Sequence, residues 1–167
     1  MKNSYQIPRT KFHCSKIKDK CGALMTRFLG IDFGTKYTGI ALSDHGGTLA
    51  FPLTSFNRFS RAQLQEAING LINTYEVETI VVGLPISLDG ILHGQGMKTH
   101  SFIEYLRLHL SIPVHPWNEQ YSTQIATQFL QDAGHKPSKD KGPLNASAAT
   151  VILQDYLDTH RLERNEY

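Results

Sequence analysis

The spacing of apolar residues changes partway along this chain. Three short apolar segments come first, and turn-forming residues separate them, namely Gly34 and the run His45–Gly47. The segments span 28–33, 37–43 and 49–56. Closely spaced strands with short glycine-containing connections are typical of an antiparallel meander. We therefore predict a three-stranded sheet at the start of the folded region.

Helical spacing follows the meander. The first predicted helix carries six apolar residues at helical intervals: Leu64, Ala67, Ile68, Leu71, Ile72 and Tyr75. A second predicted helix carries four on one face: Phe102, Ile103, Leu106 and Leu110. Between them, the continuous run Thr79–Val82 predicts a strand that is buried on both faces, and Gly83–Pro85 ends it.

The last third of the chain predicts one more strand and two helices. The strand, 112–117, contains Pro113 and Pro116, which suit an edge or a strand end. One helix is expected over 122–133. The last is expected to begin near Asn145 and to bury five residues: Ala148, Val151, Ile152, Tyr156 and Leu157. A meander followed by alternating helices and strands predicts an α/β fold, a mixed five-stranded sheet with helices on its faces.

Length and charge indicate one domain behind a basic leader. A chain of 167 residues can bury a core as a single domain. Met1–Phe28 has a net charge of +6, whereas the remainder carries −4. The expected division is a basic leader at 1–27, a folded domain at 28–160 and a short tail at 161–167. The internal Met25 leaves open that the leader is an over-extended start.

Cysteine spacing and hydropathy exclude several classes of protein. The two cysteines, Cys14 and Cys21, lack the spacing of zinc ligands. No apolar run is long enough to span a membrane, and the leader lacks the apolar core of a secretion signal. We therefore expect a cytoplasmic protein without a membrane partner.

The first candidate for chemistry is Asp32, an acid in the otherwise apolar run Phe28–Phe33. A charge among apolar residues is costly unless it meets a cation. Gly34 follows closely and lets the backbone turn sharply. The pattern suits a carboxylate held on a rigid strand against a metal ion or a phosphate. A surface aspartate at a hairpin bend is the alternative interpretation.

A second acid, Glu119, comes directly after a predicted strand. Cleavage of a phosphodiester by two divalent ions needs several oxygen ligands from distant parts of the chain. Mg²⁺ and Mn²⁺ prefer such hard oxygen ligands. Asp32 and Glu119 fit that requirement, although two acids are not diagnostic by themselves. We interpret Trp117 and Tyr121, which flank Glu119, as core residues rather than as base-stacking residues.

Four segments of the chain resemble the YqgF/RuvX family of bacteria, in the family's order. They are Leu29–Asp44, Val81–Gly90, Asn118–Thr123 and Asn145–Asp158. The resemblance implies a ribonuclease-H-like fold and metal-dependent hydrolysis of nucleic acid. The family is described as nucleases that mature the 5′ end of precursor 16S rRNA and, by analogy of fold, as Holliday junction resolvases in DNA recombination and repair.

The resemblance also implies a site. Asp32, Glu119 and Asn145 match the three catalytic positions and would hold Mg²⁺ or Mn²⁺. Asn145 replaces an aspartate of the family pattern, and its carbonyl can bind a hard cation but brings no charge. Two nearby acids, Asp44 and Asp89, are candidates for a supporting role.

Contacts to nucleic acid are expected from Thr35 and Lys36 after the glycine turn, and from Lys139 and Lys141 in a polar loop. Lysines that are merely solvated are the alternative interpretation. The triplet Asn118–Gln120 departs from the family's Asp-Glu-Arg. Gln120 replaces the arginine of the family pattern, whose guanidinium would donate paired hydrogen bonds to a phosphate. The implied partner is precursor rRNA, with branched DNA as the alternative. Ribosomal particles are a further expected partner, and a monomer and a homodimer are both consistent with the sequence.

Two other classes stay open at this point. Asp32–Thr35 is similar to the first phosphate motif of actin-like phosphotransferases, but those enzymes need a second homologous half that this sequence does not supply. The other class is a nucleic-acid- or ribosome-binding protein that has lost full metal binding, because Asn118, Gln120 and Asn145 are neutral.

Overall fold

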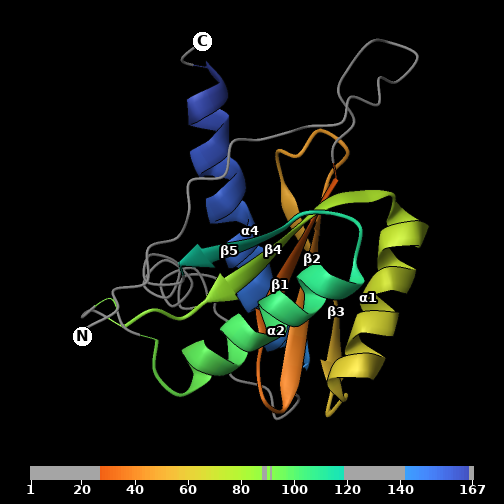
Figure 1. The fold of residues 1–167 in the computed structure, drawn as a ribbon. Helices are drawn as coiled ribbons and strands as arrows, with labels where there is room; N and C mark the ends of the chain where they lie inside the picture. Colours follow the sequence, from red (N-terminus) through yellow and green to blue (C-terminus); the bar gives the residue numbers. More distant parts are fainter. Residues whose placement is uncertain (1–26, 88–89, 91, 119–141, 166–167) are drawn as a thin grey trace.

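The computed structural model describes residues 27–87, 90, 92–118 and 142–165, and the side chains of the last helix from Ala146 to Arg161 (Figure 1). The elements in chain order are β1 (Arg27–Phe33), β2 (Tyr37–Ser43), β3 (Ala50–Asn57), α1 (Arg61–Tyr75), β4 (Val77–Leu84), α2 (Gln95–His109), β5 (Val114–Asn118) and α4 (Gly142–Asn165). The leader and the helix expected over 122–133 lie outside the described residues, so both stay predictions. Within the described ranges, no helix is long and apolar enough to cross a membrane.

The strands form one five-stranded sheet in the order β3-β2-β1-β4-β5. Strand β2 pairs antiparallel with both β1 and β3, whereas β4 pairs parallel with both β1 and β5. The meander is therefore followed by two parallel strands, and the predicted mixed sheet is confirmed. The last strand lies at the edge of the sheet, one of the two positions that its prolines suit, with Pro116 inside β5.

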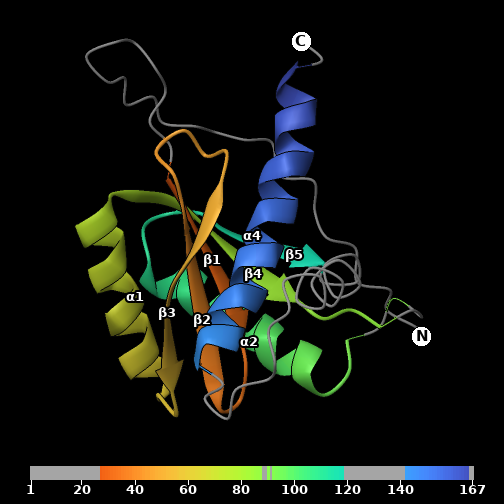
Figure 2. The same ribbon diagram turned by 180° about the vertical axis from the view of Figure 1, so that it is seen from behind.

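Helices cover both faces of the sheet. Figures 1 and 2 show α1 and α2 on one face and α4 on the other. Two apolar clusters fill the layers between sheet and helices. Strand β4 contributes to both clusters, with Ile80 and Val82 in the cluster under α1 and α2 and Val81 in the cluster under α4. This confirms the burial on both faces that the continuous apolar run of this strand predicts.

Helices α1 and α2 follow the predicted apolar faces. Ser60 caps α1 by accepting a hydrogen bond from the Gln63 N–H, and the Gln63 side chain accepts one from the Ser60 N–H in return. Phe102, Ile103 and Leu106 of α2 are fully buried. The cap stabilises the start of α1, and the buried residues attach α2 to the sheet.

The prediction for α4 was partly wrong. The helix begins at Gly142 rather than near Asn145, and it continues beyond His160 into the segment expected to be a tail. Ala148 and Val151 are only half-buried. The buried face instead comprises Ala146, Ala149, Ile152, Leu153, Tyr156 and Leu157. The rotation of α4 is set by a close contact with β1, which the pattern of apolar residues along the helix does not encode.

Candidate active site

Asp32 lies at the carboxyl end of β1, next to the strand's last residue. Its side chain lies on the face covered by α4, because Gly30 and Phe28, two and four positions earlier, both contact that helix. The side chain is half-buried. The sheet thus holds this carboxylate at the rim of the domain, on the side of α4.

The environment of the Asp32 carboxylate favours a cation. Burial raises the pKa of Asp32 above its ordinary value. No hydrogen bond or ion pair reaches the carboxylate from any residue that the structure describes. A half-buried carboxylate without a partner is costly, and a bound divalent cation would offset that cost. Carboxylate oxygens are the ligands that Mg²⁺ and Mn²⁺ prefer, so this residue fits such a metal.

Helix α4 begins at the Asp32 end of β1. The ring of Phe28 lies 5.9 Å from the ring of Tyr156. Gly30 lies two residues further along β1, on the same face of the sheet. It approaches Ala149 and Leu153 so closely that an added Cβ would lie 2.7 Å from the Leu153 Cβ. The helix therefore runs antiparallel to β1. Its first turn, which includes the backbone of Asn145, lies toward Asp32, whereas the Asn145 side chain is outside the described residues.

The end of β5 lies level with Asp32. Ile31 of β1 pairs with Val82 of β4, and the next residue of β4 pairs with Trp117 of β5. Two strand spacings separate β1 from β5, which is about 10 Å. Strand β5 ends at Asn118, and Glu119, the next residue in the sequence, is outside the described residues.

Trp117 belongs to the packing of α4, as predicted. Its indole N–H donates a hydrogen bond of 2.7 Å to Asp155 Oδ2, and its ring stands edge-on to Tyr156 at 5.2 Å. The Tyr156 hydroxyl lies 2.8 Å from His115 Nδ1. Burial lowers the pKa of His115, and the neighbouring His160 and Arg107 lower it further. These contacts anchor the end of β5 on α4.

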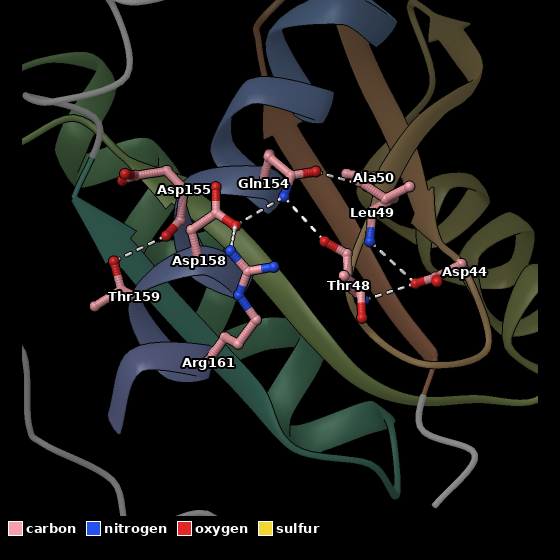
Figure 3. A network of polar contacts seen from close by, with 9 residues as sticks. All are labelled: Asp44, Thr48, Leu49, Ala50, Gln154, Asp155, Asp158, Thr159 and Arg161. Carbon is pink, nitrogen blue, oxygen red and sulfur yellow. Dashed lines mark hydrogen bonds and ion pairs between the residues drawn. The ribbon is translucent and has the colours of Figure 1, made fainter. Parts of the chain in front are cut away.

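The structure does not bring Asp44 to Asp32. Asp44 follows β2, which runs antiparallel to β1, so it lies at the opposite end of the sheet. Its Oδ1 accepts hydrogen bonds from the backbone N–H groups of Thr48 and Leu49, at 2.6 and 3.1 Å (Figure 3). Asp44 therefore stabilises the β2–β3 turn, and it is left out of the site proposed below.

The same turn is held from α4 by Gln154. Its Oε1 accepts a hydrogen bond from the Ala50 N–H at 2.9 Å, and its Nε2 donates to the Thr48 carbonyl at 3.0 Å (Figure 3). Asp158, which accepts from Gln154, also lies 3.7 Å from Arg161. This network is structural, and it lies away from Asp32.

Thr35 and Lys36 lie in the β1–β2 turn and are exposed. Gly34 is required there, because an added Cβ would collide with the Tyr37 carbonyl. The Lys36 ammonium lies over the Tyr37 ring, 5.2 Å from its centroid. The turn thus presents a hydroxyl and a cation next to the end of β1. The other residues predicted to take part, Asp89, Lys139 and Lys141, are outside the described residues.

Gln95 is a residue near the site that the sequence did not suggest. It opens α2, and its Nε2 donates a hydrogen bond of 2.7 Å to the carbonyl of Phe33, the residue after Asp32. A second, longer contact of 3.5 Å joins Gln95 to Thr99. Gln95 therefore ties the start of α2 to the end of β1. No motif indicates it, since a glutamine at a helix start is ordinary.

Solved structures of other proteins share this arrangement. Thermus thermophilus RuvC in complex with a Holliday junction substrate matches with a TM-score of 0.53 at 12% sequence identity, covering 81% of this chain and 96% of that one. The fowlpox virus resolvase in complex with Holliday junction DNA matches with a TM-score of 0.50 at 11% identity, covering 80% and 98%. At these identities the likeness concerns the fold, which is the ribonuclease-H-like fold of such resolvases.

Sequence comparison is more specific. The family model RuvX, described as Holliday junction resolvase, matches residues 26–159, and the chain belongs to this family. It is 40% identical over 136 residues to a protein of Thermoanaerobacter pseudethanolicus named "Putative pre-16S rRNA nuclease", covering 81% of this chain and 98% of the relative. A relative in Halothermothrix orenii with the same name is 39% identical over 132 residues, covering 79% and 94%. The chain is thus a member of a family of nucleases, enzymes that hydrolyse phosphodiester bonds, as the sequence predicted.

Proposed function

We propose that this protein is a metal-dependent nuclease that acts in the maturation of the 5′ end of precursor 16S rRNA. The observation that carries the proposal is the half-buried Asp32 carboxylate, which has a raised pKa and no partner among the described residues. The names of the relatives support the substrate, because the chain covers nearly their whole length. Family membership also favours a nuclease over an actin-like phosphotransferase.

Asp32, Glu119 and Asn145 are the proposed ligands of Mg²⁺ or Mn²⁺. Asp32 lies at the end of β1, Glu119 follows β5, and the backbone of Asn145 lies in the first turn of α4. Divalent ions at such a site supply stabilisation of the attacking and leaving oxygens of the phosphodiester. The chain's own contribution is the end of a central strand that fixes the carboxylate, with Lys36 and Thr35 beside it to hold the nucleic-acid backbone. Lys139 and Lys141 are proposed to contribute further backbone contacts.

Asn145 limits the charge of this ligand set. An asparagine carbonyl ligates a hard cation without adding negative charge, so two carboxylates have to hold the metal. We therefore propose weaker metal binding than in relatives with an aspartate at this position. In the extreme case the protein retains nucleic-acid or ribosome binding and cleaves slowly.

Resolution of branched DNA is the second candidate function. The description of the family model and the fold shared with RuvC favour it. Both candidates place the substrate at the same end of the sheet, and both fit a cytoplasmic protein that is a monomer or a homodimer. They differ in substrate, not in the chemistry of Asp32.

A cleavage assay with two substrates tests the proposal. The protein is incubated with precursor 16S rRNA and, separately, with a four-way DNA junction, in Mg²⁺ and in Mn²⁺, beside the Asp32→Asn variant and an EDTA control. We expect metal-dependent cleavage of the RNA by the native chain and none by Asp32→Asn. Cleavage of the junction alone would favour the second candidate. Cleavage of neither substrate would favour a protein that binds nucleic acid without cleaving it.

A further inference from the structure

Two connections meet beside the proposed active site, at the lower end of the strands in Figures 1 and 2. One is the β1–β2 turn with Lys36, and the other joins β3 to α1 and contains Arg58 and Phe59. The backbone N–H of Arg58 donates a hydrogen bond of 2.9 Å to the Lys36 carbonyl, so the connections are in direct contact. Both lie at the Asp32 end, because the strand register pairs Phe33 with Thr38 and Thr38 with Phe56.

Three cations gather in this corner. Lys36, Arg58 and Arg61 are all exposed, and the segments 33–38 and 56–65 contain no acid. Arg61 opens α1, where a cation faces the positive end of the helix dipole and is therefore unfavourable. The stability of α1 thus gives no reason for an arginine at this position.

Arg58 adds a second unfavourable feature. Its φ of 55° is left-handed, a conformation that costs roughly 1 kcal/mol or more for a residue with a side chain. Glycine would avoid that cost. Strained residues cluster where a side chain is needed for binding, so the strain and the helix-start cation together point to a ligand of negative charge.

An aromatic ring lies among these cations. Phe59 is 46% exposed, and its ring centroid lies 5.0 Å from that of Phe56, with 32° between the ring planes. Phe56 in turn packs against the core cluster under α1 and α2. The supported ring of Phe59 is therefore a suitable platform for a nucleic-acid base.

We propose that Lys36, Arg58, Phe59 and Arg61, the basic corner, bind a single-stranded stretch of nucleic acid that extends from the scissile phosphate across the ends of β2 and β3. The inference rests on the proposed function, since it assigns the strand conformation of that substrate. Bases stack on protein rings only where they are unpaired, and cations along the backbone path supply sequence-independent affinity. In a duplex the faces of the bases are covered by neighbouring bases, so Phe59 would have no base to stack on.

Binding without cleavage tests the basic corner. Fluorescence anisotropy in EDTA measures the Kd of the full chain for labelled single-stranded RNA, single-stranded DNA and the corresponding duplexes. Phe59→Ala is compared with Phe51→Ala, a phenylalanine of similar exposure at the other end of β3, 53% against 46%. The double variant Lys36→Gln/Arg58→Gln is compared with Arg161→Gln on α4.

Phe59→Ala should weaken single-strand binding about tenfold, the loss of one stacked base, whereas Phe51→Ala should bind like the native chain. The double charge variant should lower the slope of log Kd against log salt by about 1.4, because two backbone contacts are lost. A loss of affinity of Phe59→Ala for single-stranded RNA, for single-stranded DNA or for both supports the inference. Equal Kd values for Phe59→Ala and Phe51→Ala, or tighter binding of duplex than of single strand, would overturn it.

The two proposals can fail separately. If the native chain cleaves nothing but its single-strand binding depends on Phe59, the proposed function fails and the basic corner stands. If the chain cleaves RNA and neither set of variants changes binding, the basic corner fails and the nuclease stands.

Discussion

Gly30 controls how closely α4 approaches the strand that carries Asp32. An alanine at this position would place its Cβ 2.7 Å from the Leu153 Cβ and 3.0 Å from the Ala149 carbonyl oxygen. Carbon atoms in ordinary contact are about 3.5–4.0 Å apart. Gly30→Ala must therefore push α4 away from β1 by about 1 Å. The helix cannot relieve this by a side-chain rotation, since the clash involves its own Cβ and backbone.

Both stability and activity should respond. Overpacking of this kind costs about 1–3 kcal/mol of unfolding free energy. Each kcal/mol lowers Tm by about 2–4 °C in a domain of this size. The shift also moves the first turn of α4, with Asn145, relative to Asp32. A misplacement of about 1 Å at a catalytic site can cost on the order of 100-fold in rate.

Thermal denaturation and the cleavage assay measure the two effects. The matched control is Gly70→Ala in α1, where an added Cβ meets nothing within 4 Å and alanine should stabilise the helix by roughly 0.5–1 kcal/mol. We expect opposite shifts of Tm from the two substitutions. If Gly30→Ala is as stable as the native chain and cleaves at the same rate, the contact between β1 and α4 does not define the site.

Three further outcomes are expected. Burial raises the pKa of Asp32 in the folded state, so its contribution to stability is full below the unfolded value of 3.8 and is lost as the pH rises through the folded value. In urea denaturation without metal, Asp32→Asn should therefore be more stable than the native chain at pH 7, and the difference should shrink toward pH 4. Equal or lower stability of Asp32→Asn at pH 7 would contradict a raised pKa of Asp32. Asn145→Asp should tighten manganese binding by about tenfold or more, because an added unit charge near the ion is worth more than about 1.4 kcal/mol; an unchanged affinity in calorimetry would remove position 145 from the ligands. Gln154→Ala should lower the unfolding free energy by about 1–3 kcal/mol, since the Ala50 N–H and the Thr48 carbonyl lose a shared partner, and an unchanged denaturation midpoint would show that this network adds no stability.

The fold was accessible from the sequence because its signals are local. Alternation and helical spacing report which residues face a core, and the continuous run Thr79–Val82 reports burial on both faces. Asp32 stood out for the same reason, as one charge within an apolar strand. The family's order of motifs then added a fold name that the patterns alone do not specify.

Features that depend on distant contacts were not accessible. The buried face of α4 is set by Gly30, more than a hundred residues earlier, so Ala149 and Leu153 are buried where Ala148 and Val151 were expected. Asp44 directly follows β2, whereas Asp32 lies near the end of β1; because the two strands are antiparallel, the two acids lie at opposite ends of the sheet. The antiparallel meander predicted from the sequence already implies this separation, so the sequence itself argued against Asp44 as a supporting acid.

Metal binding by Asp32 is the point on which the proposed chemistry depends, and calorimetric titration with manganese measures it directly. The native chain, Asp32→Asn and Asp44→Asn are titrated side by side. Asp44→Asn is the matched control, because an asparagine Oδ1 still accepts the turn's hydrogen bonds at the opposite end of the sheet. We expect the native chain and Asp44→Asn to bind manganese alike and Asp32→Asn to lose binding. Equal affinity of Asp32→Asn and the native chain would contradict a metal site at the end of β1.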